Sequence, residues 1–195
     1  MSGENKMIEE AKNGNFEAFG ELISLYEKKI YNYCLRMTNR REDAEDLTQE
    51  VFVRVYKALK GFKGNSQFST WIFRIAHNIC IDHYRKSKLT TFSLNQPRNE
   101  EDQREMDLPS EDPTPEEEAL RKEQQEFLLK CIEELRPEYK TVIILRDIQH
   151  HSYEEIAEIL DVPLGTVKSH ISRARSALRE TVRPLLQGGD ERALR

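Results

Sequence analysis

The sequence has few cysteines, and the three that it has are far apart, at Cys34, Cys80 and Cys131. There is no CxxC pair and no paired His/Cys spacing, which argues against both a zinc site and a disulfide framework. Each cysteine stands near an apolar helical stripe. We therefore expect reduced core thiols, and neither a metal nor another cofactor.

Long apolar runs are also missing, so no segment approaches the length of a membrane span. The N-terminus is charged and lacks the apolar centre of a signal peptide. With 33% charged and 37% hydrophobic residues, the composition is that of a soluble protein. We expect a cytoplasmic location.

Strand-like alternation is absent, and pairs of turn residues are scarce. Before residue 96, apolar residues recur instead at helical spacing. The pattern predicts one long helix face over residues 16–37, a second helix over 42–59 and a third over 68–84. The fold class is therefore all-α, and these helices form a first domain at residues 1–95.

The net charge of −5 is concentrated in the middle of the chain. Residues 97–118 hold ten acidic and two basic residues and four of the seven prolines. Such a segment cannot bury enough apolar surface to fold alone, so residues 96–118 are predicted to be an acidic flexible linker. It acts either as a spacer or as a cover for a basic helix when DNA is absent.

The second small domain, at residues 119–195, is predicted to be a four-helix domain with a helix-turn-helix. Ser152 and Glu155 have the spacing of a capping box that begins one helix. Pro163 and Gly165 interrupt the pattern, and Thr166 is the expected N-cap of the next helix. The apolar stripe of that second helix is Val167, Ile171, Ala174 and Leu178.

The outer face of this second helix combines serines with long cations. Serines permit close approach to a DNA groove, while Lys and Arg reach base edges and phosphates. The alternative is a surface helix whose cations are merely solvated, but the capped helix-turn-helix pattern favours DNA. The outer face consists of Lys168, Ser169, Ser172, Arg173, Ser176 and Arg179.

The helix over residues 42–59 has an outer face of Asp46, Gln49, Glu50 and Val53. Acids near a helix N-terminus can simply favour the helix dipole, but that does not explain Gln49 and Val53. A valine among polar residues on a convex face suits a partner helix. We interpret this face as a protein contact.

The helix over 68–84 is apolar on one side and carries Phe73, His77, Cys80 and Tyr84 on the other. Two interpretations stay open: a central helix packed on both faces, or an aromatic and cationic platform for unstacked bases. The preceding loop, KGFKGNSQFSTW, has a composition that suits single-stranded DNA.

Three stretches in order, DAEDLTQEVFVRVYKAL, FKGNSQFSTWIFRIAHN and SYEEIAEILDVPLGTVKSHISRARSAL, resemble bacterial sigma factors of the extracytoplasmic-function group. The resemblance covers both domains. It implies a promoter-specificity factor that binds core RNA polymerase, recognises the minus-thirty-five and minus-ten elements and helps to open DNA. It also implies promoter DNA as a partner, an anti-sigma protein as an inhibitor, and no small-molecule substrate.

The resemblance implies a role for each face. Asp46, Gln49, Glu50 and Val53 would bind the polymerase clamp. The minus-ten element would be met by Phe62, Asn65, Ser66, Phe68, Arg74, His77, Asn78 and Arg85. The minus-thirty-five element would be met by Thr166, Lys168, Ser169, Ser172, Arg173, Arg175, Ser176 and Arg179, with Arg175 on a flanking phosphate.

One position departs from the family pattern: Asp161 stands in the turn where glycine is common, so slight backbone strain is expected there. A helix-turn-helix regulator that acts without core polymerase is the alternative function. A metal-dependent nuclease is disfavoured, because the acids lie consecutively on one exposed helix instead of converging from several segments. The protein is not expected to be an enzyme.

Overall fold

The computed structural model describes residues 3–91 and 127–192, and within these ranges every regular element is a helix. The all-α prediction is therefore confirmed. The acidic linker predicted at 96–118 lies outside the described residues. No helix in the described ranges has the length and apolar character needed to cross a membrane.

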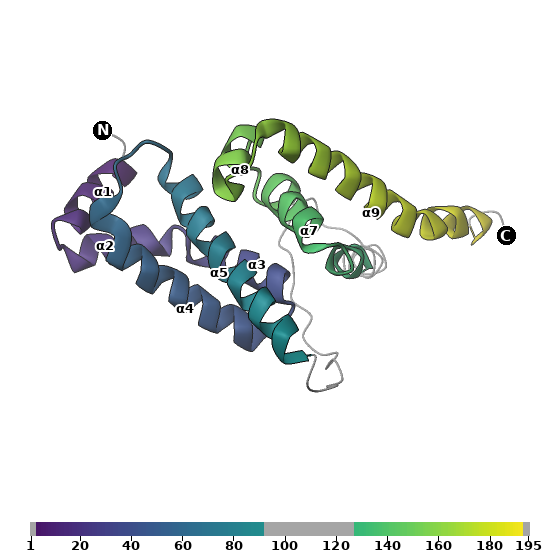
Figure 1. Ribbon diagram of the computed structural model, residues 1–195, viewed down its shortest axis with the longest axis horizontal. Helices are drawn as coiled ribbons and strands as arrows, with labels where there is room; N and C mark the ends of the chain where they lie inside the picture. The colour runs from purple at the N-terminus through teal and green to yellow at the C-terminus, as the bar shows by residue number, and fades with distance from the viewer. Residues whose placement is uncertain (1–2, 92–126, 193–195) are drawn as a thin grey trace.

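The first half of the chain is a bundle of helices joined by short turns (Figure 1). The Asn15 side chain accepts hydrogen bonds from the backbone N–H groups of Glu17 and Ala18 and so caps the second helix. Asn39, in the left-handed conformation at φ 59°, ends the third. The elements are α1 (Gly3–Lys12), α2 (Phe16–Ser24), α3 (Glu27–Thr38), α4 (Arg41–Ala58), a 3₁₀ turn η1 (Leu59–Gly61) and α5 (Phe68–Thr91).

The prediction of one long helix over residues 16–37 was wrong, because the chain turns between α2 and α3. The backbone N–H of Tyr26 bonds to the carbonyl of Ile23, and Ile30 then donates to Tyr26 to begin the next helix. Both helices still bury their apolar side, with Leu22 and Ile30 fully inaccessible. The starts of the helices predicted at 42 and 68 are confirmed within one residue.

The second half contains a helical segment at residues 127–133, then α7 (Pro137–Ile143), a π-helical turn η2 (Ile144–Ile148), α8 (Tyr153–Leu160) and α9 (Leu164–Arg192). The predicted capping box is present: Ser152 accepts from the Glu155 N–H, and the Glu155 carboxylate accepts from the Ser152 N–H. Helices α8 and α9 form the predicted helix-turn-helix.

The turn between α8 and α9 agrees with one prediction and contradicts another. Asp161 has φ 54° and ψ 49°, the left-handed conformation expected from its place in the pattern. Thr166, however, is not the N-cap, because α9 begins two residues earlier. The carbonyl of Pro163 already accepts hydrogen bonds from the N–H groups of Thr166 and Val167.

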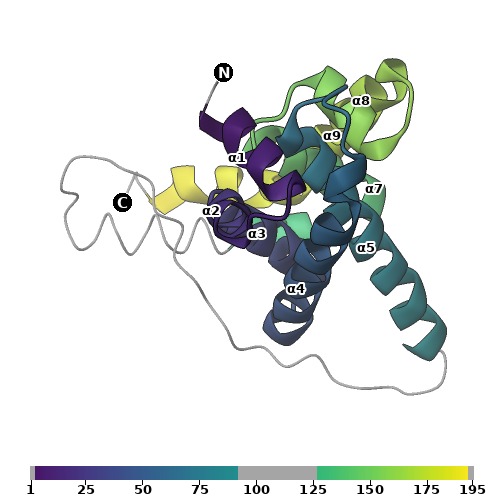
Figure 2. The same ribbon diagram turned by 90° about the vertical axis from the view of Figure 1, so that its left-hand side faces the viewer.

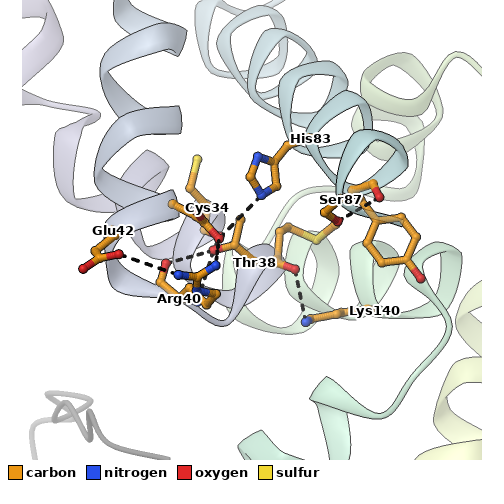
Figure 3. Close-up of polar contacts among 10 residues, drawn as sticks. Cys34, Thr38, Arg40, Glu42, His83, Ser87 and Lys140 are labelled. Carbon is orange, nitrogen blue, oxygen red and sulfur yellow. Dashed lines mark hydrogen bonds and ion pairs between the residues drawn. The ribbon is translucent and has the colours of Figure 1, made fainter. Parts of the chain in front are cut away.

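The two halves pack against each other and share a continuous apolar core. Helix α8 packs against α5, and α7 meets α3, so that the green α8 lies beside the teal α5 (Figures 1 and 2). Lys140 of α7 donates from Nζ to the carbonyl of Met37, the residue before the last of α3, at 3.3 Å (Figure 3). We call this contact surface between the two halves the seam. It joins residues far apart in the sequence and could not be predicted from local sequence patterns.

Candidate nucleic-acid and protein interfaces

Helix α9 has one buried and one open side. Val167, Ile171 and Ala174 point into the core and are at most 2% exposed. The opposite side holds the residues predicted to meet the minus-thirty-five element. Lys168, Ser172, Arg173, Arg175, Ser176 and Arg179 are exposed, and Thr166 and Ser169 are half-buried. The structure thus brings all eight residues onto the accessible side of one helix.

Arg175 stands apart from the other cations because it is paired within the protein. Its guanidinium lies 2.5 Å from the carboxylate of Asp147, at the end of the π-helical turn. The hydrogen bond to Asp147 raises the pKa of Arg175, so its charge is secure. Within the described residues, Lys168, Arg173 and Arg179 have no carboxylate partner, so their charges remain available to phosphates.

The outer face of α4 presents Asp46, Gln49, Glu50 and Val53 to solvent, as predicted from their spacing. The Val53 side chain is 51% exposed. Glu50 forms an ion pair with Arg54 at 2.5 Å, and both side chains are nearly half exposed. The face therefore offers an apolar spot bordered by carboxylates, on a helix whose other side is fixed by Val51 and Val55 in the core.

Two further features of this face were missed by the sequence reasoning. Tyr56, one turn beyond Val53, is 41% exposed and stacks on Phe16 of α2 with ring centroids 5.7 Å apart. Phe16 itself is 72% exposed. The exposure of Tyr56 could have been predicted from its spacing to Val53 on the same helix. The position of Phe16 could not, because it depends on the tertiary contact between α2 and α4.

A shallow groove of about 410 Å³ adjoins Gln49 on the other side. Its walls come from the end of α2, from α3 and from α4. The groove is lined by Ser24, Glu27, Lys28, Tyr31, Glu45, Thr48 and Gln49.

The aromatic residues predicted for the minus-ten element are mostly inside the protein. Phe62 is 8% exposed and Phe68 is 3% exposed. Their rings are 5.6 Å apart, and Trp71 lies within 5.5 Å of both. These three rings hold the loop before α5 against the start of that helix. Trp71, which is half-buried, was not singled out from the sequence.

The polar members of the same set lie on the surface. Asn65, Arg74, Asn78 and Arg85 are exposed, and Ser66 is half-buried. A second groove, of about 310 Å³, lies between α4 and α5 beside Asn78. It is lined by Arg54, Lys57, Ala58, Ile75 and Asn78. Arg54 and Lys57 are thus cationic neighbours of Asn78 that the sequence reasoning did not place there.

His77 differs from its neighbours on α5 because it faces inward. Its Nδ1 lies 3.2 Å from the hydroxyl of Tyr33. Burial, with a smaller effect of the Arg85 charge, lowers the pKa of His77 to about 4, so the ring is neutral at pH 7. Phe73 and Cys80 on the same side are 1% and 2% exposed. Of the two interpretations left open for this side, the packed helix holds for Phe73 and Cys80, whereas His77 and Tyr84 are half-buried.

The described residues contain no group of three or more His, Cys, Asp or Glu side chains that could hold a metal ion. Cys34, Cys80 and Cys131 are all buried free thiols, as expected for core positions. The grooves and faces described above present hydrogen-bonding groups, charges and apolar surface.

Comparison with protein families gives two matches. Residues 22–90 match the model of Sigma-70 region 2. Residues 126–178 match that of Sigma-70, region 4. The first match contains α3, α4 and all but the last residue of α5, and the second contains α8 and the first half of α9.

Curated relatives align over nearly the whole chain. The ECF RNA polymerase sigma factor SigW of Bacillus subtilis is 37% identical, covering 92% of this chain and 97% of its own. The ECF RNA polymerase sigma-E factor of Haemophilus influenzae is 35% identical, covering 92% and 95%.

A solved structure of the sigma factor RpoE with the anti-sigma factor NepR, from Bartonella quintana, shares the fold. Its TM-score is 0.69 at 23% identity, with 85% of this chain and 96% of that chain covered. CnrH, solved with the cytosolic domain of CnrY, has a TM-score of 0.65 at 23% identity, with 91% and 96% covered.

Proposed function

The chain belongs to the ECF RNA polymerase sigma factors, and from that premise we propose which of its surfaces bind core polymerase and which read promoter DNA. Its function is that of a promoter-specificity factor in transcription initiation. One observation carries the assignment of surfaces: a single chain exposes a basic, serine-rich face on α9 and a separate acidic and apolar face on α4.

Helix α9 is assigned to the minus-thirty-five element. Its exposed cations without carboxylate partners, Lys168, Arg173 and Arg179, can reach phosphates or base acceptors, while Ser172 and Ser176 permit close approach. A single helix supplies only a few contacts, each giving about 1 to 3 kcal/mol of discrimination. The helix alone is therefore a weak reader of sequence.

The loop before α5 and the exposed side of α5 are assigned to the minus-ten element. Asn65, Arg74, Asn78 and Arg85 are accessible there, and the groove beside Asn78 has two cations in its wall. Phe62 and Phe68 support the loop from within the core. Unstacking a base from the duplex costs a few kcal/mol. Contacts between the extruded base and such a groove offset that cost.

The face formed by Asp46, Gln49, Glu50 and Val53 is assigned to core polymerase. Attachment there makes both DNA contacts effectively intramolecular, so that two modest affinities combine. We set the domain limits at residues 1–95 and 119–195, with 96–118 as the tether between them. The free protein is then a poor promoter binder, and the polymerase complex binds promoters specifically and opens them.

The same premise extends to partners, location and chemistry. An anti-sigma protein is proposed as an inhibitor. In support, RpoE, which has a similar fold, was solved in complex with the anti-sigma factor NepR, and CnrH was solved in complex with the cytosolic domain of CnrY. Such an inhibitor can be identified as a protein that competes with core polymerase for binding to this chain. The proposed location is cytoplasmic, where polymerase and promoters are. The chain supplies binding and specificity, and no catalytic reaction is assigned to it.

The test is a run-off transcription assay on genomic fragments with purified core polymerase. Val53→Asp places a charge in the apolar spot of α4, and we expect core binding to fall at least tenfold and run-off product to fall with it. Leu128→Asp is the matched control, since Leu128 is also an exposed apolar residue, at 45%. Equal losses in both variants would refute the assignment, as would tight sequence-specific DNA binding by the chain without polymerase.

A further inference from the structure

Two cysteines that are 46 residues apart in sequence meet in the core of the first half. Cys34 comes from α3 and Cys80 from α5, and their sulfur atoms are 3.8 Å apart. Cys34 is fully inaccessible and Cys80 is 2% exposed. Neither residue contributes to a surface assigned to polymerase or DNA, so the pair is a chemical feature that the proposed function does not use.

The pair lies at the seam between the two halves. Met37, one turn after Cys34 on α3, accepts a hydrogen bond at its carbonyl from Lys140 of α7. Its Sδ is also 3.7 Å from the hydroxyl of Thr141. Figure 3 shows Lys140 reaching the end of α3 beside Cys34 and Thr38. Residues of the C-terminal half therefore rest on the same turn of α3 that holds one of the two thiols.

The two thiols are not equivalent. The Cys80 thiol donates its hydrogen bond toward the Cys34 sulfur. This bond lowers the pKa of Cys34 despite its burial, and it raises the pKa of Cys80. A thiolate is the reactive form of cysteine, and two thiols in contact can act in turn as the attacking and the resolving group.

We propose that Cys34 and Cys80 are a modification site that hydrogen peroxide converts to an intramolecular disulfide. The Cys34 thiolate attacks one peroxide oxygen and the O–O bond breaks, leaving a sulfenic acid and a hydroxide that takes up a proton to become water. The Cys80 sulfur then attacks the sulfenic sulfur. The S–S bond forms, the S–O bond breaks, and the hydroxyl leaves as a second water with the Cys80 proton. The two thiols lose two electrons, and the peroxide gains them.

Oxidation must bring the two sulfur atoms closer together than they are in the reduced protein. A disulfide holds its sulfurs about 2.05 Å apart, well inside the contact distance seen here. Whatever part of that gap side-chain rotation leaves open is closed by movement of α3 toward α5, and this movement shifts the turn on which Lys140 and Thr141 rest. The modification site is thus coupled to the contact between the two halves of the protein.

The test uses the full chain with Cys131→Ser, so that only the two partner thiols remain. Folded protein is treated with hydrogen peroxide, then unfolded and alkylated, and its mass is measured by mass spectrometry. The expected result is a loss of 2 Da with no alkylation, and a trypsin digest in which residues 30–36 and 75–85 are joined. Reduction with dithiothreitol should separate them again.

Cys34→Ser and Cys80→Ser, each added to that background, should leave one thiol that alkylates or is oxidised without an internal cross-link. Wild-type protein digested in the same way provides the result if these variants fail to fold. Full alkylation of both thiols after peroxide would overturn the proposal, as would a disulfide that forms only in urea. Amide exchange in α7 should rise at least threefold on oxidation and return on reduction, and unchanged exchange would refute the coupling.

Discussion

The ring of His151 packs edge-on against the ring of Phe73, with centroids 4.7 Å apart and planes at 75°. His151 precedes the capped start of α8, and Phe73 belongs to α5, so one contact joins the helix-turn-helix to the bundle. Phe73 packs in turn on Tyr33 of α3. The C-terminal half is therefore held against two helices of the N-terminal half.

His151→Ala should weaken this seam, and it also removes the 3.7 Å contact between the ring Nδ1 and the carboxylate of Glu155. An aromatic pair contributes about 0.5 to 1.5 kcal/mol beyond its buried area, so we expect a loss of about 1 to 2 kcal/mol in the free energy of unfolding. The matched control is His150→Asn, since His150 is exposed and has φ 62°, which asparagine tolerates. Urea unfolding of both variants measures the difference, and equal losses would contradict the role given to His151.

His77 should make the stability of the protein depend on pH. Its pKa is about 4 in the folded protein, against 6.5 in an unfolded chain, because burial disfavours the charged ring. The stabilisation from the neutral ring is complete above about pH 6.5 and is lost as the pH falls from 6.5 to 4, because only the unfolded chain takes up the proton there. The loss should reach up to about 3 kcal/mol.

The His77 effect can be isolated by substitution. His77→Gln removes the titrating ring, so its free energy of unfolding should fall less between pH 7 and pH 4.5 than that of the wild type. His150→Asn again serves as the control, because that histidine is exposed. A wild-type curve parallel to that of His77→Gln would show that this histidine titrates normally.

The elements that could be predicted are those whose signal is local. The capping box of Ser152 and Glu155, the left-handed Asp161 and the inward stripe of α9 each depend on residues within a few positions of one another. The outer face of α4 was likewise predictable from spacing alone. In each case the chain's own neighbours determine which side is buried.

The predictions that were wrong or missing concern features that depend on packing between residues far apart in the sequence. The apolar period runs through Leu25 and Tyr26 without a proline or glycine, so nothing local announces the break between α2 and α3. Phe62 and Phe68 read equally well as base-stacking or core residues, and their mutual packing with Trp71 buries them. Docking of His151 on Phe73 joins residues 78 positions apart, which no periodicity reveals.

Asp161→Gly should stabilise the helix-turn-helix. Asp161 has φ 54°, a conformation that is costly for residues with a Cβ and easy for glycine. The greater freedom of glycine in the unfolded chain opposes part of the gain, so we expect about 0.5 to 1 kcal/mol. Thermal unfolding measures it. Asp161→Ala should shift the melting temperature in the opposite direction, and a loss of stability in both variants would show that the Asp161 side chain matters more than its backbone.

Asp147→Asn should make the protein bind DNA more tightly without changing sequence preference. Asp147 holds the guanidinium of Arg175 at 2.5 Å, so its charge competes with any phosphate for that cation. Neutralising it should raise non-specific DNA affinity several-fold at low salt and steepen the dependence of log affinity on log salt by about one phosphate contact. Glu138→Gln, an exposed acid on α7, makes the same change in net charge elsewhere. Arg175→Ala should flatten the salt dependence. If Asp147→Asn and Glu138→Gln behave alike, the effect comes from overall charge, and Arg175 does not contact the DNA backbone.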